Sequence, residues 1–230
     1  MSATLAKEYL AGIPAWTFYK RRDPSFKFLP EPHDYLFEEQ RYWSPSSVFL
    51  DIGYVDMTHY KPEHRHRGSY VHRTTHLIDE GDPDIWKTLY AEGSEYLGFV
   101  EAYCEFKEVW KFKPRMREEP IYHPQYHYGV TPDGEGIILG GDEAIVELKT
   151  GTMLWWTAIQ TAAQEMAIHS WDKDPSKTRR RFGVELKKTG KFRVKEFDDD
   201  GDNYTWQANL HTAKRHHKEP PVKLTAASGY

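Results

Sequence analysis

The chain has 230 residues, which is enough for one large domain with a substantial core. Hydrophobic residues make up 39% and charged residues 29%, with 8 Trp, 15 Tyr and 11 Phe, a composition that excludes a disordered protein. The net charge of −4 argues by itself against a nucleic-acid partner, and the single cysteine, Cys104, excludes a disulfide framework or a four-cysteine metal site.

The sequence contains no apolar run long enough to cross a membrane and no N-terminal signal peptide. With one cysteine, this predicts a cytoplasmic protein without a membrane partner.

The first elements in chain order are an arm and two helices. Residues 1–45 are rich in proline and aromatic residues without a clear period, and we predict an irregular arm packed on the domain. A helix is expected from about Pro62 to Asp79, ended by Gly81. Apolar residues at helical spacing predict a second helix from Pro83 to about Lys111, closed by Pro114.

After Pro114 the pattern changes to short segments rich in aromatic or β-branched residues. "EEPIYHP", "QYHYGVTPD", "GEGIILG" and "EAIVELKTG" are separated by Pro or Gly, and we predict consecutive strands of one sheet. An Ala-rich helix with Thr152 as N-cap should follow, then a hairpin turning at residues 188–190, then a last helix. The predicted fold is an α/β (α+β) domain over residues 46–217 with a mixed central sheet flanked by helices, and residues 218–230 form a tail.

One strand, "AIVELKTG", carries charges inside an apolar run. Strand alternation puts Ala144, Val146 and Leu148 on the core face, and it puts Glu147 and Lys149 together on the other face. The preceding hairpin can bring Asp133 beside Glu147. Two carboxylates that meet in this way can bind Mg²⁺ or Mn²⁺, and a neighbouring lysine can orient a water or stabilise phosphoryl charge.

"PD" at residues 132–133 followed by "ELK" at 147–149 resembles the signature of the PD-(D/E)XK nuclease superfamily. The surrounding sequence is similar to the RecB-type and phage (lambda-type) exonuclease branch: Gly68 and His72 form a Gly-x-x-x-His element, and Gln160 follows on the next helix. The likeness spans roughly residues 42 to 215. It departs from the family where a Tyr usually stands four residues after the Gln, because Gln164 occupies that position.

The resemblance implies a restriction-endonuclease-like core and metal-dependent DNA cleavage without an iron–sulfur cluster. It implies metal ligands at His72, Asp133, Glu147, the Leu148 carbonyl and Glu118, with Glu119 as an alternative to Glu118. It further implies that Lys149 positions or activates the attacking water and that Gln160 orients Lys149 or contacts DNA. Glu135, Asp142 and Glu143 could replace a named carboxylate, although turn solvation is their simpler role.

The segment from Trp171 to Lys195 holds ten Lys/Arg against three acidic residues, so it carries about +7 while the remainder carries about −11. Such a block can hold a phosphate backbone, and a solvated hairpin is the plain alternative. The predicted DNA-binding residues are Arg179, Arg180, Arg181, Lys187, Lys188, Lys191 and Arg193. The pair Trp155-Trp156 is expected to pack in the core and on a helix face rather than stack on bases.

The sequence thus predicts a divalent-metal-dependent DNA nuclease, most simply an exonuclease in phage-type recombination or DNA processing. A recombination or single-strand-binding partner and a homo-oligomer are compatible with the resemblance. Two alternatives stay open: a non-catalytic DNA-binding or assembly protein on the same fold, and a zinc hydrolase that uses His72 and His76. "HRTTH" has the histidine spacing of zinc hydrolases but lacks the Glu after the first His.

Overall fold

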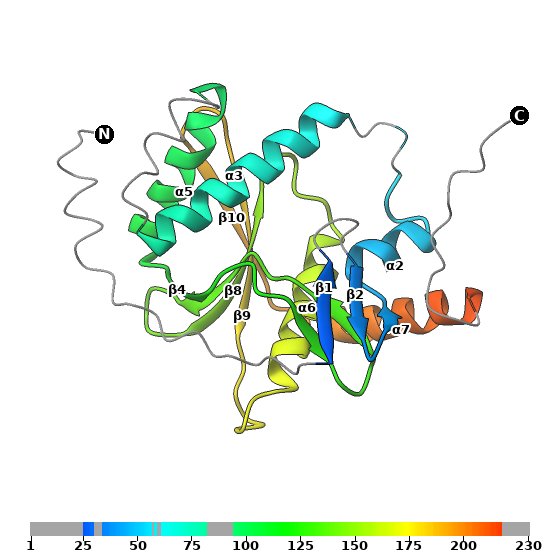
Figure 1. The fold of residues 1–230 in the computed structure, drawn as a ribbon. Helices are drawn as coiled ribbons and strands as arrows, with labels where there is room; N and C mark the ends of the chain where they lie inside the picture. The colour runs from blue at the N-terminus through cyan, green and yellow to red at the C-terminus, as the bar shows by residue number, and fades with distance from the viewer. Residues whose placement is uncertain (1–24, 30–33, 57, 59–60, 82–93, 218–230) are drawn as a thin grey trace, which may run out of the picture.

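The computed structural model describes residues 25–29, 34–56, 58, 61–81 and 94–217. A five-stranded mixed sheet lies at its centre, in the order β10-β9-β8-β7-β4 (Figure 1). Its neighbouring strands run antiparallel except for β8 and β9, which are parallel. The strands are β4 (Lys113–Met116), β7 (Gly134–Ile137), β8 (Glu143–Lys149), β9 (Arg180–Leu186) and β10 (Phe192–Phe197).

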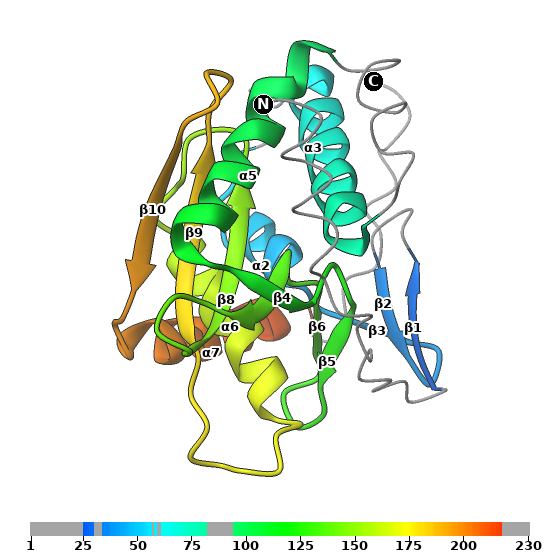
Figure 2. The same cartoon turned by 90° about the vertical axis from the view of Figure 1, so that its left-hand side faces the viewer.

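Helices cover both faces of this sheet (Figures 1 and 2). On one face lie α3 (Pro62–Glu80) and α5 (Leu97–Trp110), which is preceded by the short 3-10 helix η1 (Ser94–Tyr96). On the other face lie α6 (Thr157–His169) and α7 (Gly201–His216). This is the predicted α/β class, a mixed central sheet flanked by helices.

The alternation of β8 follows the prediction. Ala144, Val146 and Leu148 pack in the cluster under α3 and α5, whereas Ile145 packs in the cluster that contains α6 and α7. Because β8 and β9 are parallel, the chain must cross over between them, and α6 makes this crossover on the Ile145 face. The face of β8 that carries Glu147 therefore lies against α6.

Several predicted element ends are confirmed. Pro62 stands in the first turn of α3, and Gly81 ends the helix with a φ of 72°. The hairpin of β9 and β10 turns through Gly190, whose φ of 77° suits glycine. The last helix begins at Gly201.

The expectation of one sheet for the four strands before α6 was wrong. The strands β5 (Ile121–His123) and β6 (Tyr128–Val130) pair with each other in a separate two-stranded sheet, and Tyr128 of β6 adds an isolated bridge to Trp43. Pro132 stands between β6 and β7, and a proline cannot donate a ladder hydrogen bond, so the pairing stops there.

Two further boundaries differ from the prediction. Pro114 was expected to close a helix, but α5 ends at Trp110, and Pro114 belongs to the edge strand β4, where proline is tolerated. Thr152 was expected as an N-cap, but α6 starts at Thr157 after a turn in which the Thr157 N–H donates to the Leu154 carbonyl at 3.0 Å.

Part of the stretch expected to be irregular forms regular structure. The strands β1 (Phe26–Leu29), β2 (Asp34–Phe37) and β3 (Gln40–Tyr42) make a three-stranded antiparallel sheet, followed by α2 (Pro45–Asp51). Phe26 of β1 and Phe37 of β2, which are directly opposite each other, both pack on Tyr122 of β5 and so join this sheet to the rest of the domain.

Residues 1–24, 82–93 and 218–230 lie outside the described residues, and with them most of the predicted arm, the start of the second helix and the tail. The domain boundaries at residues 45 and 217 therefore stay predictions. Among the described helices, none combines the length and apolar character that a membrane span requires.

Candidate metal and phosphodiester site

The hairpin of β7 and β8 brings Asp133 and Glu147 together. Gly134 pairs with Val146, so Asp133 and Glu147 stand one position beyond this pair, across from each other. Both are buried, with 7% and 4% of their surfaces exposed. Asp133 is fixed further because its Oδ2 accepts a hydrogen bond from the Leu148 backbone N–H at 2.7 Å.

His72 reaches this point from α3. Its Nδ1 lies 3.0 Å from Oδ1 of Asp133 and 3.7 Å from Oε1 of Glu118. One possible ligand atom from each of the three residues lies within 4.8 Å of the others. Oε1 of Glu118 is buried and has no hydrogen-bond partner in the described part of the structure.

These donors fit a divalent cation. Two carboxylates and one imidazole supply oxygen and nitrogen ligands at a single point, and the lone pairs of the Glu118 oxygen are unused. The backbone of Glu118 is also held in a left-handed conformation, with a φ of 47°, which is uncommon for residues other than glycine. His72, Glu118 and Asp133 thus form a candidate ligand group that contains three of the five ligands predicted from the sequence.

The charges of the group depend on one another. Burial lowers the pKa of His72, but the neighbouring Asp133 and Glu118 outweigh it and raise this pKa to about 9. Burial raises the pKa of Asp133, and the opposing effects of His72, Lys149 and the Leu148 N–H leave that pKa below its ordinary value. Asp133 is therefore held as a carboxylate, the form that binds metals.

Glu147 is held by a different set of groups. Its Oε1 accepts from Lys149 Nζ at 2.7 Å and from Gln160 Nε2 at 2.8 Å, and its Oε2 accepts from Gln164 Nε2 at 2.8 Å. Burial and the nearby Asp133 raise the pKa of Glu147, against the lowering effect of Lys149. Glu147 stands outside the group of three possible ligands in this structure, and its role as a ligand stays a prediction, as does that of the Leu148 carbonyl.

Lys149 is positioned from two sides. Its ammonium lies between Glu147 and Oε1 of Gln160, which accepts at 3.1 Å, and it also lies 5.3 Å from the centre of the Trp156 ring. Gln160 thus links the strand to the helix through both ends of its amide, in agreement with the predicted orienting role.

Sequence reasoning missed the contact made by Gln164. This side chain is 1% exposed and takes the position where the family usually has a Tyr, yet it binds the Glu147 carboxylate. The available signal was its spacing, since a residue four positions after Gln160 lies on the same helix face.

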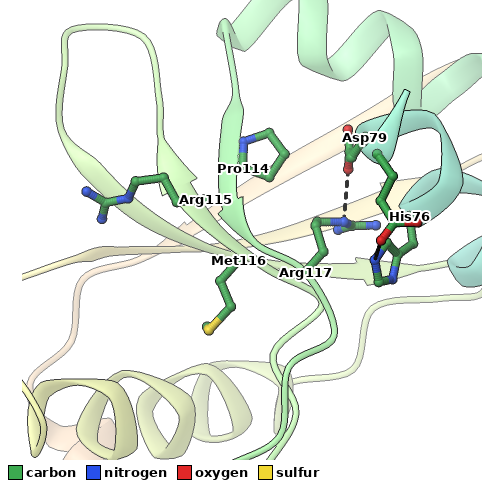
Figure 3. A pocket seen from close by; sticks show the side chains of 7 residues that line it. His76, Asp79, Pro114, Arg115, Met116 and Arg117 are labelled. Carbon is green, nitrogen blue, oxygen red and sulfur yellow. Dashed lines mark hydrogen bonds and ion pairs between the residues drawn. The ribbon is translucent and has the colours of Figure 1, made fainter. Parts of the chain in front are cut away.

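A buried ionic group beneath the site was also missed. Arg117 lies beside Asp79 of α3 at 2.9 Å, donates to Oγ1 of Thr75 at 2.9 Å and also donates to the backbone carbonyl of Asp133. Asp79 binds Lys107 of α5 in turn. Figure 3 shows Arg117 and Asp79 facing each other in a small hollow next to His76. This group fixes α3, and with it His72, against the Asp133 turn.

His76 does not join His72. Its Nε2 lies 3.2 Å from Glu80, and the candidate ligand group found among the described residues does not include it. The four-residue spacing of the two histidines therefore does not produce the joint zinc site of the alternative hypothesis here.

The predicted DNA-binding residues fall into two groups. Arg179 and Arg181 are buried: Arg179 pairs with Asp172 and Glu135, and Arg181 pairs with Asp202. These two guanidinium groups therefore stabilise the fold. The other predicted residues lie on β9, β10 and their turn with partly or fully exposed side chains, and their contact with DNA stays a prediction: Arg180, Lys187, Lys188, Lys191 and Arg193.

The other acidic candidates have partners of their own. Glu135 and Glu143 both pair with Arg115, and Asp142 pairs with Arg180. These ion pairs give each of them a structural role at the rim of the sheet. Glu119, the alternative to Glu118, has no place in the candidate ligand group.

Comparison with known proteins gives distant likenesses only. No family model matches the chain, and no curated protein matches it. A crystal structure described as a "putative exonuclease" from Eubacterium rectale superposes with a TM-score of 0.42 and 14% identity, over 74% of this chain and 69% of that one. The crystal structure of SSO0001 gives a TM-score of 0.34 and 14% identity, over 75% and 85% of the two chains. At these TM-scores we base no conclusion on the likeness.

Proposed function

We propose that this protein is a divalent-metal-dependent DNA nuclease of the PD-(D/E)XK type. The observation that carries the proposal is the meeting of His72, Glu118 and Asp133 beside the hydrogen-bonded group of Glu147 and Lys149. Phosphodiester hydrolysis of this type needs a cation and a charge-stabilising donor at the same phosphate. The carboxylates can bind the cation, and the neighbouring lysine can be the donor.

The cation supported by these ligands is Mg²⁺ or Mn²⁺. Oxygen ligands suit both ions, and the imidazole of His72 is more compatible with Mn²⁺. Asp133 and Glu118 would hold the ion together with His72, and Glu147 and the Leu148 carbonyl would complete its ligands. When bound, such an ion neutralises phosphate charge and lowers the pKa of a bound water.

The protein's own residues supply orientation and charge. The Lys149 ammonium is held by Glu147 and Gln160, so it can point at a water or a phosphate oxygen without searching among rotamers. Gln164 keeps the carboxylate of Glu147 from turning away. These side chains would therefore stabilise the charge that develops on the phosphate during attack.

The DNA would be held mainly through its backbone. The exposed cations of β9, β10 and their turn could contact backbone phosphates, and binding of this kind is independent of sequence and sensitive to salt. The finer parts of the proposal are exonuclease action, a role in phage-type recombination or DNA processing in the cytoplasm, a recombination or single-strand-binding partner, and a homo-oligomer.

A cleavage assay tests the proposal. Linear double-stranded, single-stranded and circular DNA are incubated with Mg²⁺ or Mn²⁺, using the wild type and Lys149→Ala. We expect metal-dependent loss of the linear substrates, resistance of the circular one, and a rate at least 100-fold lower for the variant.

Each outcome has a clear meaning. Equal rates for the variant and the wild type, or no metal-dependent cleavage of any substrate, would refute the nuclease proposal. DNA binding without cleavage would favour the non-catalytic alternative. Stoichiometric zinc with loss of activity in His76→Ala would favour the zinc hydrolase.

A further inference from the structure

The loop that leaves Lys149 carries two adjacent tryptophans with opposite surroundings. Trp156 is partly buried and packs against Phe49, with ring centres 5.4 Å apart, and against the Lys149 ammonium. Trp155 has 60% of its surface exposed, so the expectation that both tryptophans pack in the core and on a helix face was wrong for Trp155. An exposed aromatic ring offers a face on which a nucleobase can stack.

Trp155 is exposed but held in place. Its ring contacts Tyr54, with centres 4.6 Å apart, and Tyr54 is itself held by stacking on Phe49 and by a hydrogen bond from its hydroxyl to Asn209 at 3.3 Å. The backbone carbonyl of Trp155 accepts from Ala158 in the first turn of α6. A ring that is fixed in this way loses little conformational entropy when a flat ligand stacks on it.

The position of Trp155 relative to the site is set by its neighbour. Trp156 touches Lys149, and its carbonyl accepts the backbone N–H of Gln160 at 2.9 Å. Trp155 therefore lies one residue away from a side chain that borders the reacting group. A nucleotide next to the bond being cut could place its base there.

A cation from α3 contacts the same loop. Nε of Arg67 on α3 donates to Oγ1 of Thr150 at 3.3 Å, and its guanidinium lies 5.5 Å from the centre of the Phe99 ring. The loop is thus bordered by a positive charge near residue 150 and by an exposed aromatic face at residue 155. Proteins that bind single strands combine these two features, a charge for the phosphate and a ring for the base.

We infer that Trp155, supported by Tyr54, forms a stacking subsite for an unpaired nucleobase of the strand that is cut. The inference rests on the proposed nuclease function and adds a substrate form to it, a single-stranded DNA end. An unpaired base is required because the faces of bases inside a duplex are covered by their neighbours.

Equilibrium binding tests this subsite without relying on cleavage. A fluorescent deoxythymidine oligonucleotide and an abasic oligonucleotide of equal length are titrated with protein in EDTA, and Kd is read from anisotropy. The variants are Trp155→Ala, Trp155→Phe and Trp155→Leu, and Tyr204→Ala on α7 is the control, since its ring is 73% exposed and lies outside the loop.

We expect Trp155→Ala to weaken thymidine-strand binding by about 5- to 150-fold and to leave binding of the abasic strand unchanged. Trp155→Phe should retain most of the affinity, Trp155→Leu should lose it because it is apolar without a π face, and Tyr204→Ala should match the wild type. The comparison of the Phe and Leu variants also decides the question if the Ala variant folds poorly.

Two results would overturn the inference. An unchanged Kd in Trp155→Leu, or an equal loss on the abasic strand, would mean that the ring does not stack on a base. If the wild type cleaves DNA with metal in that case, only the subsite fails. If the wild type binds neither oligonucleotide and cleaves nothing, the proposed function fails with it.

Discussion

Two carboxylates of the site, Glu147 and Glu118, differ in burial and in what surrounds them: Glu147 is buried, whereas the Glu118 side chain is 29% exposed with only its Oε1 buried. Glu147 accepts hydrogen bonds from three side chains, so both of its oxygens are satisfied by the protein. Oε1 of Glu118 has no hydrogen-bond partner in the described structure, and its nearest charged neighbour is His72 at 3.7 Å.

The difference shows that the two sides of the site are built for different tasks. Around Glu147 the protein supplies every partner, which fixes Lys149 in one orientation. Around Glu118 and Asp133 negative charge gathers beside His72 and Lys149, and the buried Oε1 of Glu118 is left without a hydrogen bond among the described residues. Under the proposed function, a cation from outside would complete that side, with Glu147 as a further ligand, whereas the hydrogen bonds of Glu147 are complete without it.

The largest effect is expected from the substitution Asp133→Asn. The amide can still accept the Leu148 N–H, so the fold should persist, but the ligand charge is gone. We expect Mn²⁺ binding measured by calorimetry to be lost, together with about a 1000-fold or greater loss of cleavage. Gln160→Ala on the other side is the matched control, since it should keep Mn²⁺ binding. Retained metal binding in Asp133→Asn would contradict this assignment of the two sides.

His123 lies outside both sides of the site, but its protonation should also change the stability of the protein at low pH. Burial lowers the pKa of this histidine to about 4, and its Nδ1 accepts from the backbone N–H groups of Gln125 and Tyr126. The unfolded chain binds this proton near pH 6.5, before the folded one does, so the contribution of His123 to the free energy of unfolding should fall between pH 6.5 and 4 by roughly 3 kcal/mol and stay constant above pH 6.5.

Urea unfolding at several pH values measures this loss. His123→Asn keeps an acceptor for the two N–H groups but has no titrating ring, so its stability should change less over the same pH interval. An identical pH profile for variant and wild type would show that protonation of His123 does not cause the acid sensitivity.

Gln164→Ala tests whether the Glu147 side depends on full hydrogen bonding. The change leaves Oε2 of this buried carboxylate without its donor, so we expect a loss of about 1–3 kcal/mol in the free energy of unfolding. Mn²⁺ affinity should change little. Gln164→Tyr introduces the residue usual in the nuclease family that the sequence resembles, and its hydroxyl should recover part of the stability by donating to the same oxygen. An unchanged free energy of unfolding in Gln164→Ala would show that the contact contributes nothing.

The smallest effect is expected at the exposed cations of the β9–β10 hairpin. Replacing Lys188 and Lys191 by Ala should weaken DNA binding about threefold to tenfold at low salt, with a smaller difference at high salt, because fewer counterions are released. Lys113→Ala is the control, since it removes an exposed lysine from β4 at the opposite edge of the sheet. Equal losses in the control and the double variant would indicate general charge rather than a binding face.

Much of the fold followed from local patterns. The helical spacing and the proline and glycine at its ends predicted α3, and the alternation in "AIVELKTG" predicted both faces of β8. The partition of strands was not predictable, because β5 and β6 look like their neighbours in sequence and differ only in what they pair with. The strand β4 was not predicted because Pro114 is typical of a helix end, and its position in an edge strand is not evident from the sequence.

The site divides in the same way. The sequence by itself determined which charged groups meet, because residue type and two-residue alternation place Glu147 and Lys149 on one face and a short hairpin returns Asp133 to them. Only the tertiary structure decided which groups complete it. Gln164, Arg117 and Asp79 come from elements whose approach depends on helix packing, and distances between such elements are not encoded in the spacing of residues along the chain.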